Sequence, residues 1–93
     1  MPELAYLNGR YCAIEEAVVP VDDRGYQFGD GVYEVVRSYS GTLWELDRHM
    51  KRLERSLKET GITGITSEHI KEKTEEAYTK SCLPNALVYI QVT

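Results

Sequence analysis

Residues 32–39 alternate between two faces in a pattern typical of a β-strand. Val32, Glu34, Val36 and Ser38 fall on one side, and Tyr33, Val35, Arg37 and Tyr39 on the other. β-Branched and aromatic residues dominate the segment, as they do in strands. Ser40-Gly41 then supplies a turn, after which residues 42–44 are predicted to return as a second strand.

Two further strand signals lie near the ends of the chain. Asn8-Gly9 separates two apolar runs and is a strong hairpin signal, because both turn residues tolerate positive φ. Residues 86–93 read Ala-Leu-Val-Tyr-Ile-Gln-Val-Thr and predict a last strand. Residues 15–23 contain Pro20 and are predicted to be a loop with a short extended piece.

Two helices are predicted between these strands. Leu46, Met50, Leu53 and Leu57 follow the i, i+4, i+7, i+11 spacing of an amphipathic helix. Asp47 is its expected N-cap, and Gly61 its expected end.

The second helix is expected over residues 67–80, capped by Thr66 or Ser67 and ended by Pro84-Asn85. Its apolar face is weak, with Ile70, Ala77 and Tyr78. The order of elements predicts an α+β fold, a two-layer domain in which two helices cover one face of a mainly antiparallel sheet.

Composition narrows the classes of function. The chain has 93 residues, enough for one domain, and a net charge of −4, which does not favour binding to nucleic acid. Residues 1–4 show no basic start followed by an apolar run, and no segment approaches the roughly 20 apolar residues of a membrane span. We therefore expect a cytoplasmic protein with no membrane partner.

The two cysteines are too few for a disulfide framework. Cys12 and Cys82 are expected to be free thiols in a reducing compartment, with a bridge as the alternative. His49 and His69 lie far apart without a Cys or carboxylate pattern, so no metal site is predicted.

Three segments contain residues that could bind a ligand. Each can also be explained by structure or solvation alone. Residues 22–31 are dense in glycine, charge and aromatics, which suits a close backbone approach or an ordinary surface loop. Tyr33 and Arg37 share a strand face, which suits an anionic ligand or a solvated sheet. His49, Arg52 and Ser56 share a helix flank, which suits a phosphate or plain solvation.

Four stretches together resemble a known family. Residues 23–35, Asp-Arg-Gly-Tyr-Gln-Phe-Gly-Asp-Gly-Val-Tyr-Glu-Val, are similar to the N-terminal signature of class-IV aminotransferases, the fold-type IV pyridoxal-phosphate enzymes. Ser40-Gly41, the His-x-x-Arg-Leu of residues 49–53 and the strand of residues 89–93 agree in order and spacing. The resemblance covers the chain from about Leu7 to Thr93.

Within that family, residues 26–35 most resemble the D-amino-acid (D-alanine) aminotransferases. Branched-chain enzymes tend to carry Phe-Glu-Gly-Ile-Arg where this chain has residues 33–37, Tyr-Glu-Val-Val-Arg. The resemblance implies transfer of an amino group between a D-amino acid and a 2-oxo acid. Branched-chain aminotransferases and aminodeoxychorismate lyases are the alternatives within the family, and a stand-alone binding module is the alternative outside it.

The resemblance also assigns roles to four residues. Arg52 matches the arginine that binds the phosphate of pyridoxal 5′-phosphate, a role that suits its set of N–H donors. Tyr33 matches a strand tyrosine of the substrate pocket, and Val35 and Arg37 follow as further pocket candidates because they share its face. His49 is given no more than a supporting role.

Part of the implied active site has no counterpart in these residues. The family's cofactor-linking lysine lies in a second domain, and none of the five lysines here matches its context. Residues 1–93 are therefore interpreted as a truncated N-terminal small domain that is inactive alone, with the C-terminal catalytic-lysine domain as its missing partner. The complete protein is expected to be a homodimer.

Overall fold

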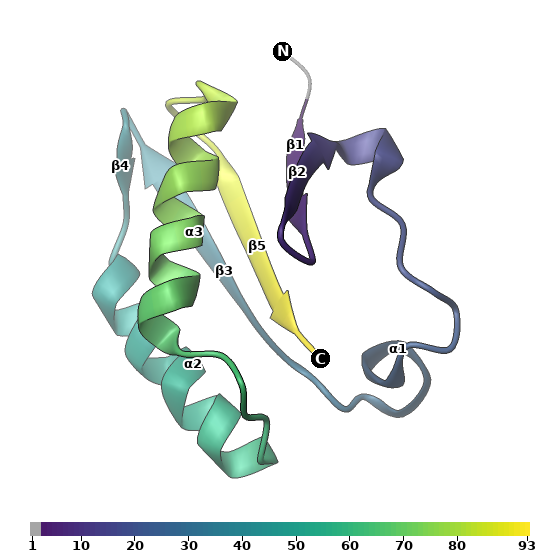
Figure 1. Ribbon diagram of the computed structural model, residues 1–93. Helices are drawn as coiled ribbons and strands as arrows, with labels where there is room; N and C mark the ends of the chain where they lie inside the picture. The colour runs from purple at the N-terminus through teal and green to yellow at the C-terminus, as the bar shows by residue number, and fades with distance from the viewer. Residues whose placement is uncertain (1–2) are drawn as a thin grey trace.

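The computed structural model describes residues 3–93 and confirms the α+β prediction. Two helices cover one face of an antiparallel sheet, and a separate hairpin lies beside it (Figure 1). The elements in chain order are β1 (Leu4–Leu7), β2 (Arg10–Ala13), a 3-10 helix (Ile14–Glu16), α1 (Arg24–Phe28), β3 (Val32–Tyr39), β4 (Thr42–Leu43), α2 (Leu46–Thr60), α3 (Ser67–Ser81) and β5 (Leu87–Val92).

The larger sheet has the order β4-β3-β5, with both pairings antiparallel. β3 pairs with β5 from Val32 opposite Val92 to Arg37 opposite Leu87. The β1–β2 hairpin forms its own two-stranded sheet. Its turn uses Asn8 and Gly9 at φ values of 49° and 87°, so the predicted hairpin is confirmed.

The core lies between β3 and the two helices. The strand alternates buried and exposed residues along its whole length, which confirms the period of two in the sequence. Because Met50, Leu53 and Leu57 are spaced for one helix face, α2 packs that face against the sheet. The buried apolar cluster comprises Val32, Met50, Leu53, Leu57 and Ile70, with Leu46, Ile62, Ile90 and Val92 packed against it.

The N-cap prediction for α2 was wrong. The helix begins at Leu46, and Glu45 precedes it in the left-handed region with φ 56°, without a side-chain cap. Asp47 lies in the first turn, where its carboxylate pairs with the Lys71 ammonium of α3 at 3.0 Å. The predicted end at Gly61 is confirmed by its left-handed φ of 75°.

The second helix matches its predicted range of residues 67–80 to within one residue. Thr66 caps α3 by accepting a hydrogen bond from the His69 amide, and the helix ends at Ser81, followed by Cys82 in a left-handed conformation. Ile70 is buried as expected. The second buried residue is Thr74, whose hydroxyl donates a hydrogen bond to the Ile70 carbonyl.

The segment before β3 contains a helix that the sequence did not predict. Asp23 caps α1 by accepting from the Gly25 amide, and Gly29 ends it at φ 70°. The Thr93 hydroxyl donates to the Asp23 carboxylate, so the end of β5 packs against this helix. The loop prediction for residues 15–23 was also incomplete, because a 3-10 turn occupies Ile14–Glu16.

Across residues 3–93, none of the helices has the length and apolar character needed to cross a membrane.

Candidate functional site

One face of the larger sheet is left open by the helices. Tyr33, Val35 and Arg37 all lie on it, because the opposite face of β3 packs against α2. Tyr33 is 65% exposed. The structure therefore places the three predicted pocket residues on a single accessible surface.

The neighbouring strand adds two polar groups that the sequence interpretation missed. Tyr89 and Gln91 of β5 lie opposite Val35 and Tyr33. The rings of Tyr33 and Tyr89 stack with centroids 5.9 Å apart and planes 16° apart, and the Tyr89 hydroxyl donates to the Gln91 side-chain oxygen at 2.8 Å. Applying the period of two to residues 86–93 would have placed both side chains on one face. We call Tyr33, Val35, Arg37, Tyr89 and Gln91 the open face.

Arg52 lies on the other side of β3, where it meets Glu34. The Arg52 Nε and Nη2 atoms donate to the two Glu34 carboxylate oxygens at 2.8 Å each. His49 Nδ1 is 2.7 Å from Glu34 Oε1. Glu34 is only 4% exposed, so both helix side chains converge on a buried carboxylate.

This contact changes the pKa values of both Glu34 and Arg52. The Arg52 hydrogen bond is the main reason why the pKa of Glu34 is lowered, with His49 adding to it and burial opposing it. The same bond raises the pKa of Arg52, to which the Tyr33 phenol makes a smaller contribution. Glu34 is thus held as a carboxylate that fixes Arg52.

Arg52 keeps unused hydrogen-bonding capacity. A guanidinium has five N–H donors, and Glu34 takes two of them, which leaves three. The Arg52 side chain is 62% exposed, so these donors are accessible to an external anion. Because its position is fixed by a buried partner, little side-chain entropy is lost when such an anion binds.

The predicted residues thus form two groups and not one. Tyr33, Val35 and Arg37 share the open face, while Arg52 and His49 contact Glu34 on the helix-facing side of β3. Ser56, the third member of the predicted helix flank, is not a hydrogen-bond partner of Glu34. The five lysines all lie on α2 or α3 and none on β3 or β5.

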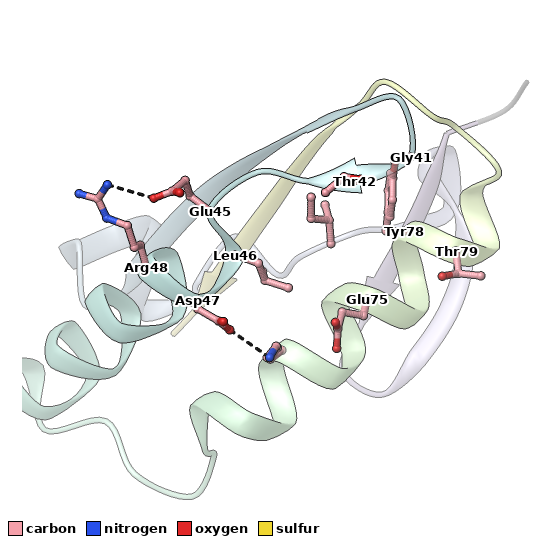
Figure 2. Close-up of a pocket in the computed structure, with 11 residues that line it drawn as sticks. Gly41, Thr42, Glu45, Leu46, Asp47, Arg48, Glu75, Tyr78 and Thr79 are labelled. Atoms are coloured by element: carbon pink, nitrogen blue, oxygen red, sulfur yellow. Dashed lines mark hydrogen bonds and ion pairs between the residues drawn. The ribbon is translucent and has the colours of Figure 1, made fainter.

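A separate groove of about 610 Å³ opens between β4, the start of α2 and α3 (Figure 2). Both of its cationic side chains already have acidic partners. Arg48 pairs with Glu45 at 3.0 Å, and Lys71 pairs with Asp47 across the groove (Figure 2). Unlike Arg52, neither cation is held by a buried carboxylate, because the Glu45 and Asp47 side chains are 36% and 80% exposed.

Comparison with known proteins gives both a family and its relatives. The family model described as "Amino-transferase class IV" matches residues 31–93. A D-alanine aminotransferase of Bacillus licheniformis is 45% identical over 87 residues, and one of Staphylococcus epidermidis is 37% identical over 89. These alignments cover 92% and 95% of this chain but only 31% and 32% of the relatives, so the chain spans about a third of their length.

Solved structures give the same fold. A branched-chain aminotransferase from Thermoproteus uzoniensis, crystallised with norvaline, matches 98% of this chain at 29% identity with a TM-score of 0.80. A T.th. branched-chain amino acid aminotransferase, in complex with N-(5′-phosphopyridoxyl)-L-glutamate, matches 98% at 22% identity with a TM-score of 0.85. Each match covers 32% of the solved chain.

Proposed function

We propose, from the premise that this chain belongs to the class-IV aminotransferase family, that it is the N-terminal part of a pyridoxal-phosphate-dependent transaminase. The complete protein would move an amino group between a D-amino acid of the alanine class and a 2-oxo acid. Sequence identities of 45% and 37% to D-alanine aminotransferases favour this substrate class. The branched-chain matches at 29% and 22% identity support the fold more than the substrate.

The observation that carries the proposal is the arrangement of Arg52. Its guanidinium is oriented by buried Glu34 and keeps three donors exposed, which suits the dianionic phosphate of pyridoxal phosphate. When bound, the cofactor supplies the carbonyl group that takes up the amino group and the electron-withdrawing ring that makes its transfer possible. Arg52 would anchor the phosphate and hold the cofactor in one orientation.

The open face would form a wall of the substrate pocket. Tyr33 and Tyr89 stack into a flat aromatic surface that can exclude water from a bound substrate. Val35 would limit the size of the substrate side chain, and Arg37 offers a positive charge near an anionic group. Tyr89 and Gln91 would extend the same wall, since they lie directly opposite Val35 and Tyr33.

This chain alone would not complete the reaction. The family chemistry requires a lysine that bonds to the cofactor and moves a proton. Lys71 pairs with Asp47, and Lys73 and Lys80 lie over the rings of Tyr6 and Tyr11, all on the helix side of the molecule. We assign residues 1–93 to a small N-terminal domain, and the lysine to a C-terminal domain of a homodimeric complete protein.

The test is an assay of the complete protein with D-alanine and 2-oxoglutarate. We expect pyruvate and glutamate in equal amounts, and little glutamate when L-leucine replaces D-alanine. Glutamate from L-leucine alone would make the protein a branched-chain aminotransferase, and pyruvate without glutamate would exclude transamination. A complete protein that neither binds pyridoxal phosphate nor turns over these substrates would be a binding module.

A further inference from the structure

The residue that follows β5 is held by the glycine-rich segment before β3, a sequence motif to which the proposed function gives no role. The Thr93 hydroxyl donates to one oxygen of the Asp23 carboxylate at 3.2 Å. The other Asp23 oxygen accepts from the Gly25 amide at 2.9 Å and so caps α1. A single carboxylate therefore joins the start of α1 to the end of β5.

Two glycines enclose the methyl group of Thr93. A Cβ atom at Gly25 would clash with Thr93 Cγ2, and one at Gly31 would lie 3.0 Å from both Thr93 Cγ2 and the Val92 carbonyl oxygen. Neither Gly25 nor Gly31 has a φ in the positive range that favours glycine, so conformation does not require glycine at either position. Space does, because only a residue without a Cβ atom leaves room for the methyl group. We call Asp23, Gly25 and Gly31 the Thr93 notch.

The segment that forms the notch is closed on itself by contacts between Arg24 and Asp30. The Arg24 Nε atom donates to the Asp30 carboxylate at 2.9 Å, and Nη2 lies 2.6 Å from the same oxygen. The Asp30 amide donates back to the Arg24 carbonyl, and the Arg24 guanidinium lies over the Phe28 ring. Residues 24–30 therefore form one closed loop, against which Thr93 packs.

The notch lies at one end of the open face. Gly31 directly precedes β3 and Thr93 directly follows β5, and Figure 1 shows α1 beside the end of β5. A single residue pair of the ladder separates Gly31 and Thr93 from the paired Tyr33 and Gln91 of the open face. The notch thus fixes the point at which the polypeptide leaves the sheet, close to the proposed substrate wall.

We infer that the Thr93 notch is a positioning device, which fixes the direction of the polypeptide beyond Thr93 and thereby how the rest of the active site meets the open face. This rests on the proposed function, which assigns the lysine to the part of the complete protein beyond residue 93. A notch that only stabilised this domain would affect turnover no more than any equally destabilising change. A positioning notch affects turnover far more, because a misplacement of about 1 Å can cost roughly 100-fold in rate.

The test compares two alanine substitutions in the complete protein. Gly25→Ala fills the notch. Gly64→Ala is the matched control, because Gly64 lies between α2 and α3 at φ 89°, where alanine is strained by its backbone conformation but has nothing within 4 Å of its Cβ atom. We expect kcat with D-alanine to fall about 10- to 100-fold in Gly25→Ala and to stay within about twofold of the native value in Gly64→Ala.

Hydrogen exchange in the cofactor-free complete protein gives a readout that needs no turnover. The amides immediately beyond residue 93 should exchange at least roughly 10-fold faster in Gly25→Ala than in the native protein, and at the native rate in Gly64→Ala. Adding Thr93→Ser to Gly25→Ala removes the methyl group, so both kcat and slow exchange should be largely restored. Thr93→Val keeps the methyl groups but loses the hydrogen bond to Asp23, and should change both readouts in the same direction as Gly25→Ala even if that variant does not fold.

Three results would overturn the inference. They are native kcat and native exchange in both Gly25→Ala and Thr93→Val, equal losses in Gly25→Ala and Gly64→Ala, and faster exchange beyond residue 93 with native kcat. Failure of the proposed function is seen separately. A native protein that is inactive with D-alanine, but whose exchange beyond residue 93 depends on the notch, would refute the transaminase assignment alone.

Discussion

Arg52 and Glu34 are joined by two parallel hydrogen bonds of 2.8 Å, formed between an exposed helix side chain and a buried strand carboxylate. The geometry is bidentate, which fixes the plane of the guanidinium as well as its distance. Glu34 thus acts as a positioning residue for Arg52, and His49 holds the same carboxylate from the preceding helical turn. The proposed phosphate anchor therefore depends on a residue that the anion itself would never touch.

Substitution Glu34→Gln should destabilise the chain at neutral pH. Gln keeps the volume but loses the charge, so we expect a loss of about 2 kcal/mol in the free energy of unfolding, as for a charge-assisted hydrogen bond. The pKa of Glu34 is lowered from 4.5 in the folded state. The contribution of the Glu34 charge to folding stability is therefore complete above pH 4.5. It is lost as the pH falls through the lower pKa that Glu34 has in the folded state.

Urea unfolding of the native chain and Glu34→Gln across roughly pH 7 to 3 measures this effect. The difference in stability should shrink as the pH falls below 4.5, the usual value for the carboxyl group. Glu54→Gln, which alters an exposed carboxylate of α2, is the matched control and should change little. A difference between the native chain and Glu34→Gln that stays constant over the whole range would contradict the ion pair.

Arg52 itself should be tested in the complete protein by two substitutions. Arg52→Ala should weaken binding of pyridoxal phosphate roughly 10- to 100-fold, as expected for the loss of a charge-assisted hydrogen bond. Arg52→Lys keeps the charge but cannot bond to both Glu34 oxygens and a phosphate together, so we expect intermediate affinity. Equilibrium dialysis against the cofactor gives the affinities, and equal affinity in all three proteins would remove Arg52 from the phosphate site.

Part of this arrangement followed from the sequence and part did not. The period of two correctly placed Glu34 on the face opposite Tyr33, and helical spacing placed His49 and Arg52 on one flank. The contact of His49 and Arg52 with Glu34 depends on how α2 is rotated and positioned against β3. Local sequence periodicity carries no information about that packing. The sequence feature that came closest to predicting this contact was Glu34, which lies between Val32 and Val36 on the buried face of the strand. Buried charges are almost always paired, so a cationic partner for Glu34 could have been expected.

The unpredicted helix α1 illustrates the same limit. It has five residues and includes Gly25, so intrinsic propensity gives no reason to expect it. Its N-cap residue, Asp23, is held by Thr93, which lies 70 positions along the chain. Similarly, α2 begins one residue before the N-cap expected at Asp47, after Glu45 in a left-handed conformation.

Gly25→Ala tests the packing of α1 against the end of β5. A Cβ atom at Gly25 would clash with Thr93 Cγ2, so one of the two segments must move. We expect a loss of about 1–3 kcal/mol in unfolding free energy, typical of overpacking. Thr93→Ser removes the methyl group and keeps the hydroxyl that bonds to Asp23, so the double variant should regain much of the stability. Equal stability of the Gly25→Ala variant with and without Thr93→Ser would show that the clash is not the cause.

Tyr11 provides a test of hairpin docking at high pH. Its burial against α3, followed by the hydrogen bond to Glu76, raises its pKa from 10.0 to about 12. The folded state therefore holds this proton more tightly than the unfolded chain. The stabilisation is complete below pH 10 and is lost as the pH rises towards 12.

Ultraviolet titration of the tyrosines should show one phenol that ionises near pH 12, and Tyr11→Phe should remove that last step. Tyr26→Phe, which alters an exposed tyrosine, is the matched control and should leave the step in place. Glu76→Gln keeps the hydrogen bond but removes the negative charge, so the step should shift to lower pH without disappearing. If the last step survives in Tyr11→Phe, the hairpin is not held on α3 through this phenol, and the layer beneath α3 is not built as the structure describes.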